Sequence, residues 1–206
     1  MGTLVNSLRG INVLVPRNFV EAAGMYNTLL LSDEPGIIIE PLNAYRLKEN
    51  LPNNLDKISV EFGVPAILKE GKDISIVTYG SMCRIVLDAA RELDEIGISC
   101  EVIDVRTLLP FDKNKTIVNS IKKTNRVVFA DEDVSGGASA FMMQNVVENQ
   151  NAYFYLDSKP ITIHSNDHRP AYSSDGDYFS KPNCENIFDK IYSLFNELNP
   201  KAYPSL

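Results

Sequence analysis

The sequence of 206 residues predicts an α/β fold, with a mostly parallel sheet flanked by helices. Short apolar runs alternate with amphipathic segments of helical period after about residue 60, and the segments have the lengths of strands and crossover helices. Hydrophobic residues make up 44% of the chain and charged residues 23%, which suits ordinary globular cores rather than disorder. These observations predict one large or two small globular domains.

The first elements form a strand–helix–strand unit. Residues 13–16 are a short apolar run, Asn18 is a suitable N-cap for a helix to about Leu31, and residues 32–36 stop that helix. Residues 37–40 then read as a buried strand. Because such a unit offers too little apolar surface to fold alone, we expect residues 1–40 to be the end of a domain whose beginning is missing. The unit should expose apolar surface and favour self-association.

Residues 41–60 carry two prolines and several asparagines without a clear apolar period, which predicts a linker. A second domain, residues 61–206, follows. Its predicted strands are residues 74–78, 100–105, 126–130 and 161–163. Four helices are predicted in it. The first covers residues 81–96 and ends at Gly97, and the second is capped near Asp112 and runs to residue 121. The other two cover residues 138–149 and 184–198.

Composition excludes several functional classes. The formal charge of −7 and the pI near 4.9 argue against a nucleic-acid partner and leave room for a basic protein partner. There is no run of about 18 apolar residues and no signal-peptide pattern, so we expect a soluble, cytoplasmic protein. Cys83, Cys100 and Cys184 are far apart and without CxxC spacing, which favours buried, reduced thiols.

Function in such sheets concentrates at the carboxyl ends of the strands, here residues 79–81, 104–112, 131–138 and 164–172. The Tyr79–Gly80–Ser81 stretch is either a phosphate cradle or a plain strand-to-helix turn. The second glycine-containing segment, residues 135–138, follows three acidic residues that would repel a phosphate, so a tight turn is favoured there.

The two histidines, His164 and His168, flank Asp167 and precede Arg169. This cluster suggests acid–base or metal chemistry, but its spacing fits no metal pattern, which favours structural or solvent-exposed histidines. The chain has no recognisable nucleophile motif and no Gly-x-Gly-x-x-Gly. The residues alone therefore indicate a soluble α/β domain with an acidic loop face.

A family resemblance adds to this reading. Residues 101–112, EVIDVRTLLPFD, closely resemble the EVIDLRTLxPxD signature of the transketolase C-terminal domain in E1 β subunits of thiamine-diphosphate-dependent 2-oxoacid dehydrogenases. Residues 10–16, 33–40, 45–46 and 73–80 resemble further family motifs in register. Residues 61–206 are thereby identified as a transketolase C-terminal-like domain and residues 1–40 as the remnant of a pyrimidine-binding domain. In residues 164–172, Asp167 and Tyr172 match the family's late loop, while the prolines do not match.

The resemblance implies an enzyme that uses thiamine diphosphate and magnesium to decarboxylate a 2-oxo acid, either pyruvate or a branched-chain acid. The acyl group passes to a lipoyl arm of E2. The activating glutamate, the acyl-transfer histidine and the diphosphate site belong to regions outside this chain, so no residue here is expected to be catalytic or cofactor-binding. The chain also resembles enzymes in which α-type and β-type regions are fused.

The family further implies two sites and several partners. Backbone carbonyls of Leu29, Leu30, Ser32 and Glu34 match a potassium site, and the late helix and C-terminus match a docking surface for a basic E2 peripheral-subunit-binding domain, with Asp189, Glu197 and Leu206 as candidates. The other implied partners are an α-type region and a second β-type region. Alternatives are another transketolase-family enzyme, a non-catalytic docking module and, from a different class, an unrelated nucleotide-binding α/β domain.

Overall fold

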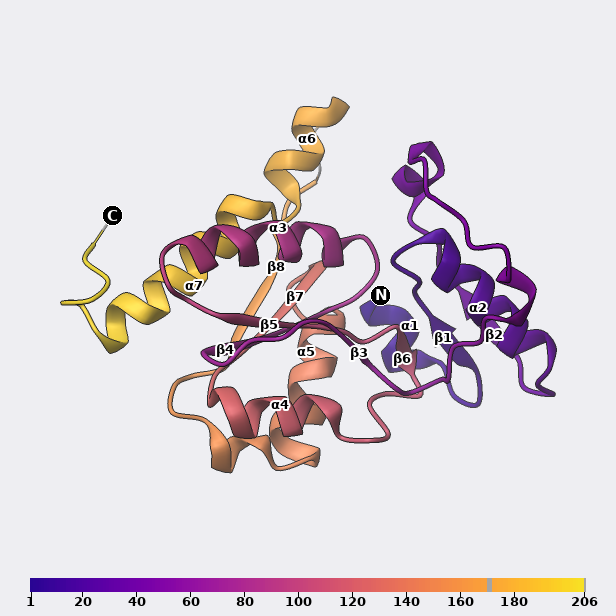
Figure 1. The fold of residues 1–206 in the computed structure, drawn as a ribbon, viewed down its shortest axis with the longest axis horizontal. Coiled ribbons are helices and arrows are strands. Elements are labelled where there is room, and N and C mark those ends of the chain that lie inside the picture. Colours follow the sequence, from indigo (N-terminus) through magenta and orange to yellow (C-terminus); the bar gives the residue numbers. More distant parts are fainter. Residues whose placement is uncertain (170–171, 206) are drawn as a thin grey trace.

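The main sheet has five strands in the order β3-β5-β4-β7-β8 in the computed structural model, which describes residues 1–169 and 172–205 (Figure 1). The neighbours β5, β4, β7 and β8 are parallel, and only β3 at one edge is antiparallel. The predicted mostly parallel sheet is thus confirmed, while β3 was not expected. The strands are β3 (Ala66–Lys69), β4 (Ile74–Thr78), β5 (Cys100–Asp104), β7 (Val127–Val134) and β8 (Ile161–Ser165).

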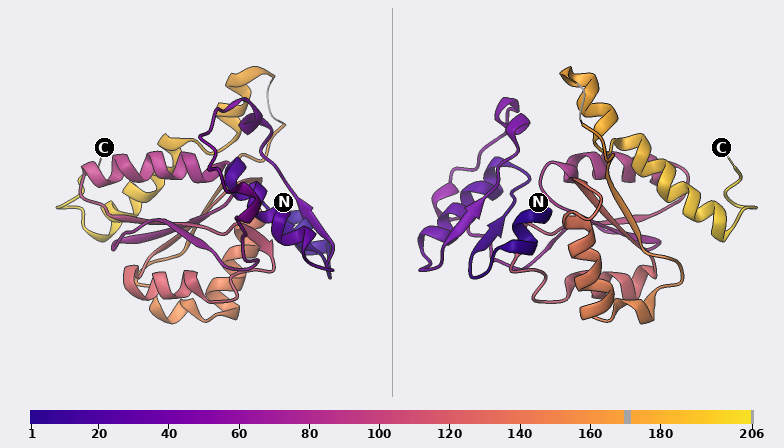
Figure 2. Two further views of the ribbon diagram at one scale, coloured as in Figure 1. Left: turned by 45° about the vertical axis from the view of Figure 1, so that its right-hand side comes forward. Right: turned by 180° about the vertical axis from the view of Figure 1, so that it is seen from behind.

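Helices cover both faces of this sheet (Figures 1 and 2). The helices α3 (Met82–Glu95) and α7 (Cys184–Leu198) lie on one face, and α4 (Thr116–Thr124) and α5 (Ala138–Met143) lie on the other. Successive strand residues point to opposite faces, and the central strands β4, β5 and β7 contribute apolar side chains to both helix layers. This explains why the strands read as near-continuous apolar runs in the sequence.

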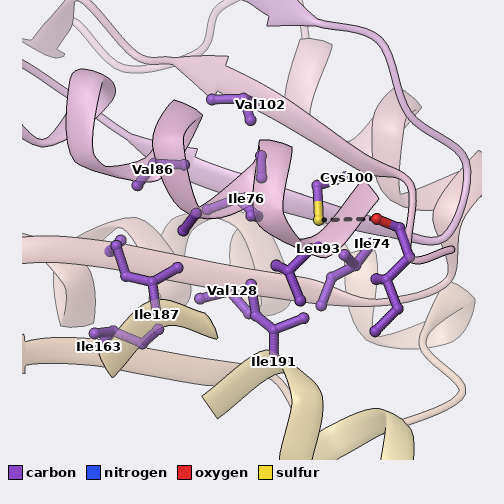
Figure 3. Packing of buried hydrophobic residues seen from close by; sticks show 14 of the residues in the cluster. Ile74, Ile76, Val86, Leu93, Cys100, Val102, Val128, Ile163, Ile187 and Ile191 are labelled. Carbon is purple, nitrogen blue, oxygen red and sulfur yellow. Dashed lines mark hydrogen bonds between the residues drawn. The ribbon is translucent and has the colours of Figure 1, made fainter. Parts of the chain in front are cut away.

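The core beneath α3 and α7 is formed by alternate strand residues. Ile74 and Ile76 of β4 point toward these helices and meet Leu93 of α3 and Ile191 of α7 (Figure 3). Ser75, between the two isoleucines, faces α4 instead. The period of two along β4 therefore places apolar atoms against one helix layer and a hydroxyl against the other.

A second, smaller sheet has the order β2-β1-β6. It consists of β1 (Asn12–Leu14), β2 (Gly36–Ile38) and β6 (Thr107–Leu109), and α2 (Phe19–Leu30) packs on it. The strand β1 is parallel to β2 but antiparallel to β6, which comes from the EVIDVRTLLPFD stretch. Residues 104–112, expected as a loop, thus contain a strand that joins the N-terminal elements to the second half of the chain.

Capping explains several helix boundaries. The Asn18 side chain accepts the Glu21 N–H at 2.8 Å, which confirms the predicted start of α2. Asp112 accepts the N–H groups of Thr116 and Ile117 at 2.8 and 3.2 Å, so it caps α4 as expected although it precedes the helix by several residues. Asn183 forms a capping box with Asn186 at the start of α7.

The remaining elements are short, and several were not expected. α1 (Gly2–Ser7) packs on α5, and α6 (Ser173–Ser180) follows β8. Short helical turns occupy Leu42–Arg46, Leu55–Lys57, Gln144–Asn149 and Ala152–Tyr155. Among the described residues, none of the helices is both long and apolar enough to cross a membrane. The domain boundaries at residues 40 and 60 stay a prediction.

Candidate functional site

A buried aspartate, Asp131, connects several elements near the carboxyl end of the main sheet. The carboxylate of Asp131 in β7 accepts hydrogen bonds from the Tyr79 hydroxyl, from the Asp133 N–H at 3.0 Å, and from the Ser139 N–H at 2.9 Å at the start of α5. Asp131 is fully buried, so these donors replace water around its charge. Burial and the nearby Asp131 charge raise the pKa of Tyr79 well above its ordinary value. This arrangement holds β4, β7 and α5 together and gives the Asp131 carboxylate a structural role.

The turn at residues 79–81 is a close packing site. Gly80 has a φ of +57°, and a Cβ there would lie 2.9 Å from Cγ1 of Val15, the residue after β1. A side chain is therefore excluded by both backbone conformation and space. Of the two interpretations offered by the sequence, this geometry fits the strand-to-helix turn.

The histidines do not form a cluster with metal ligands. His164 lies in β8, and its Nδ1 is 2.9 Å from the Ser165 carbonyl oxygen. His168 is exposed, and its Nδ1 is 3.0 Å from the Arg169 carbonyl oxygen. Within residues 1–169 and 172–205, no three His, Cys, Asp or Glu residues are placed to hold a metal ion. Residues 170 and 171 of this segment lie outside the described residues.

A buried ionic cluster, which the sequence did not predict, lies where the two sheets meet. Nη1 of Arg17 donates to Oε1 of Glu21 at 2.6 Å and to Oδ2 of Asp104 at 2.7 Å. The N–H of Arg106 donates to Oδ1 of Asp104 at 2.9 Å. We call these four residues, Arg17, Glu21, Asp104 and Arg106, the junction cluster. The only sequence signals were charged residues directly after apolar strands.

The electrostatics of the junction cluster follow from its burial. Desolvation raises the pKa of Glu21 to about 7, and the Asp104 charge acts in the same direction, while Arg17 and Arg106 oppose them. Burial alone would lower the pKa of Arg17, but the two carboxylates raise it. Burial also raises the pKa of the neighbouring Cys83 thiol, so this cysteine is held as an unreactive thiol.

The candidate potassium residues lie at the end of α2. The Leu29 carbonyl oxygen accepts both the N–H and the hydroxyl of Ser32, at 3.1 and 3.0 Å, and the same hydroxyl is 3.5 Å from the Glu34 carbonyl oxygen. The carbonyl oxygens of two of the four candidates, Leu29 and Glu34, thus lie on either side of the Ser32 hydroxyl. Leu30 lies within this last turn, with its side chain 82% exposed. Carbonyl groups at a helix end carry partial negative charge, which suits a cation.

Two of the three docking candidates lie on the exposed side of α7. Asp189 and Glu197 are exposed, and the Glu197 carboxylate lies 3.7 Å from Nζ of Lys159. Asp189 also lines a 690 Å³ groove between β8, α6 and α7. Eight residues of helix separate the two carboxylates by about 12 Å along the axis, so a single small domain can reach both. Leu206 lies outside the described residues.

The N-terminal elements also form an apolar cavity that the sequence did not reveal. It has a volume of 390 Å³, and its walls include Phe19 and Tyr26 of α2 and Tyr45 and Leu47 of the following segment. Glu40 at its rim accepts hydrogen bonds from Tyr26, at 2.8 Å, and from Tyr45. Phe19, Tyr26 and Leu30 are exposed at a helical spacing, so one face of α2 lacks an apolar partner within the described residues.

Comparison with known proteins identifies the fold family. Residues 63–187 match the family "Transketolase, C-terminal domain". The chain is 32% identical over 159 residues to the pyruvate dehydrogenase E1 component subunit beta of Acholeplasma laidlawii, covering 77% of this chain and 47% of that protein. It is 34% identical over 165 residues to the mitochondrial 2-oxoisovalerate dehydrogenase subunit beta of Chaetomium thermophilum, covering 78% of this chain and 34% of that protein.

A solved structure gives the same answer for the fold. The chain resembles a protein described as a split gene transketolase, inactive beta4 tetramer, with a TM-score of 0.72 and 23% identity, covering 94% of this chain and 61% of that one. The chain spans about half or less of the length of the two curated relatives. Since the family match covers residues 63–187, including the main sheet and the EVIDVRTLLPFD stretch, the chain belongs to the family of the transketolase C-terminal domain.

Proposed function

We propose that this chain serves as the C-terminal part of an E1 β-type subunit in a 2-oxoacid dehydrogenase acting on pyruvate or a branched-chain 2-oxo acid. The observation that carries the proposal is the similarity to E1 beta subunits of both kinds over more than three quarters of the chain. In such an enzyme, thiamine diphosphate with magnesium supplies the decarboxylation chemistry. The residues described above contribute a rigid scaffold and binding surfaces, because the buried carboxylates Asp104 and Asp131 are already paired.

We predict that the isolated polypeptide of 206 residues neither binds thiamine diphosphate nor decarboxylates 2-oxo acids. By family resemblance, the carboxylate that activates the cofactor and the diphosphate site lie outside it. Isothermal titration calorimetry with cofactor and magnesium is the measurement, and no heat of binding is expected at micromolar cofactor. The full-length E1 assembly is the positive control. Micromolar binding by the isolated chain would show that a cofactor site exists within these residues.

A cation site is part of the proposal. Potassium would be held at the end of α2 by carbonyl oxygens of Leu29, Leu30, Ser32 and Glu34, with the Ser32 hydroxyl turning away from the Leu29 carbonyl. The placement of the Leu29 and Glu34 carbonyl oxygens around the Ser32 hydroxyl supports it. Hard cations take six or more oxygen ligands, so a complete site needs additional oxygen ligands beyond these four carbonyls. Calorimetry with potassium and sodium chloride, run beside the cofactor titration, compares the two ions.

The second role we propose is docking of a basic E2 peripheral-subunit-binding domain on α7, with Asp189 and Glu197 among its carboxylate contacts. The exposure of both residues supports this role. Exposed ion pairs contribute about 0–1 kcal/mol each, so several must act together. The Lys159 contact of Glu197 would have to be exchanged for a contact with the partner.

Docking is expected to be salt-dependent. Between low and high ionic strength, we predict that the dissociation constant of the chain with its cognate E2 binding domain rises by roughly tenfold, because salt screens exposed charges. Asp189→Asn should weaken binding by about two- to fivefold. The matched control is Glu148→Gln, which removes an exposed charge on the opposite helix layer and should change nothing. Affinity that is absent, or indifferent to salt, would remove the docking role.

The third role is association with other E1 regions, either the α-type region or a second β-type region. The exposed apolar face of α2 supports it, since Phe19, Tyr26 and Leu30 otherwise remain in contact with water. We predict that the isolated chain self-associates at high concentration, as measured by light scattering. Tyr26→Glu should shift the distribution toward monomer, whereas Tyr153→Glu, at an exposed tyrosine elsewhere, should not. A strict monomer at high concentration would contradict this prediction.

A further inference from the structure

The junction cluster connects two parts of the molecule. We call β1, α2 and β2, residues 12–38, the N-terminal unit, and residues 61–206 the C-terminal unit. The contacts between them include the pairing of β1 with β6, apolar packing around Val13 and Val15, the packing of Phe62 with Leu14 and Met25, and the junction cluster. In the cluster, Arg17 and Glu21 belong to the N-terminal unit and Asp104 to the C-terminal unit. The balance of charge in the cluster therefore affects how firmly the units dock.

Two carboxylates in the cluster share one directly bound cation. A single nitrogen, Nη1 of Arg17, is the donor to both Glu21 and Asp104. Arg106 supplies the second positive charge of the cluster, but it meets Glu21 only in a longer ion pair. Its Nε and Nη2 donate to the carbonyl oxygen of Val64 at 3.0 and 2.6 Å, and Nε remains 3.9 Å from Oε1 of Glu21, beyond hydrogen-bond distance.

Burial makes this sharing costly. The side chain of Asp104 is 0% exposed and that of Glu21 is 5% exposed, so little water remains to stabilise a second negative charge. Asp104 retains two donors, Nη1 of Arg17 and the N–H of Arg106. Glu21 has the shared Nη1 and the N–H of Arg17 at 3.2 Å. Asp104 is therefore paired with a cation of the opposite unit at 2.7 Å, whereas Glu21 meets a cation of the opposite unit, Arg106, only at 3.9 Å.

We propose that Glu21 is a proton-operated latch, in which the protonated carboxyl group holds the N-terminal unit on the C-terminal unit and its ionisation loosens that contact. The charged and titratable groups that face Glu21 are Arg17 from its own unit, and Asp104, Arg106 and Cys83 from the C-terminal unit. Protonation removes the repulsion between two buried carboxylates and leaves Arg17 to neutralise Asp104.

The direction of the pH effect follows from linkage. Burial, with the Asp104 charge, raises the pKa of Glu21 from the ordinary 4.5 to about 7 in the docked state. When the units separate, water returns and the pKa falls back, so docking takes up a proton. Docking is therefore strongest at low pH, weakens as the pH rises from about 4.5 to 7, and stays weak above that. Each pH unit inside this window changes the docking equilibrium by about tenfold.

The chain contains its own reporter of undocking. Cys83 at the start of α3 is buried beside Asp104, and the charges of Arg17 and Glu21 act on it. Separation of the units should expose it to a thiol reagent. Cys100 is buried inside the core beneath α3 and α7, so it reacts only on global unfolding. Modification at Cys83 relative to Cys100, located by peptide mass spectrometry, distinguishes undocking from unfolding.

The test measures labelling of the whole chain by a disulfide reagent that reacts at acidic pH. The Cys83 rate is divided by the rate of free cysteine at the same pH, which removes the intrinsic reactivity of the thiol. We expect this ratio to be at least about tenfold higher at pH 8 than at pH 5.5, while Cys100 stays protected. Glu21→Gln, which mimics the protonated carboxyl, should lower the ratio at pH 8 to the value at pH 5.5. The control Glu95→Gln, at an exposed position of α3, should leave it unchanged.

Opposite outcomes overturn the latch. If the ratio is independent of pH, or if Glu21→Gln raises it at pH 8, the ion pair with Arg17 holds the units together and the latch is wrong. Asp104→Asn provides a second variant in case Glu21→Gln fails to fold. With the competing carboxylate gone, Glu21 should ionise without loosening the contact, so the pH dependence between 5.5 and 8 should disappear. A dependence retained in Asp104→Asn would also contradict the proposal.

Discussion

Replacement of Arg17 by methionine should lower the free energy of unfolding at pH 8 by about 3–5 kcal/mol. The variant keeps the apolar stem of the side chain but removes the donor that serves both Glu21 and Asp104. Breaking a buried pair is costly because it leaves charge without compensation. Urea denaturation followed by circular dichroism measures the loss. It should shrink as the pH falls, since the unpaired carboxyl groups then bind protons in the folded state.

A compensated variant separates charge from packing. Arg17→Met combined with Glu21→Gln and Asp104→Asn removes both carboxylates that need the arginine. We expect this triple variant to recover most of the stability lost by Arg17→Met alone, because replacing every charge of a buried cluster is often nearly neutral. If Arg17→Met is as stable as the wild-type protein at pH 8, the pairing of Arg17 with the two carboxylates does not stabilise the fold. If the triple variant stays as unstable as the single one, packing by the Arg17 side chain is the cause.

The sequence predicted the long elements because their signals are local. The helices α3 and α7 have a clear amphipathic period, the strands β4 and β5 are short apolar runs, and the observed bounds of all four lie close to the predicted ones. The short strands β3 and β6 have three or four residues, too few to show a period. β6 pairs with a strand nearly a hundred residues earlier, and that pairing has no local signature.

Candidate functional residues could be predicted from the sequence only where they belong to a family motif. The resemblance of residues 101–112 gave the family, and the family match over residues 63–187 agrees with it. The potassium and docking residues came from the same source and stay proposals. The junction cluster had no such source, because Arg17 and Asp104 are 87 residues apart in the chain and meet only through the pairing of β1 with β6. Buried ion pairs between units depend on tertiary structure that a single sequence does not display.

The other large effect is expected in the main core. Leu93→Ala should lower the free energy of unfolding by about 2–5 kcal/mol, the range for deleting a fully buried leucine side chain. Leu93 is 0% exposed and lies between β4 and α7, next to Ile74 and Ile191 (Figure 3). Because strands and two helices converge on it, the surrounding side chains have little freedom to close the cavity.

The matched control for Leu93→Ala is Leu198→Ala, which deletes the same atoms at the end of α7, where the leucine is 42% exposed. That change should cost less than about 1 kcal/mol, since part of the side chain already contacts water. Urea denaturation of both variants at one pH checks the difference. The loss in Leu93→Ala should be independent of pH between 5.5 and 8, because Leu93 packs against apolar side chains such as Ile74 and Ile191, and burial raises the pKa of the Cys100 thiol in this core to about 12. If both variants lose the same free energy of unfolding, Leu93 is no more buried than Leu198. The packing of α3 and α7 on the sheet would then differ from the description above.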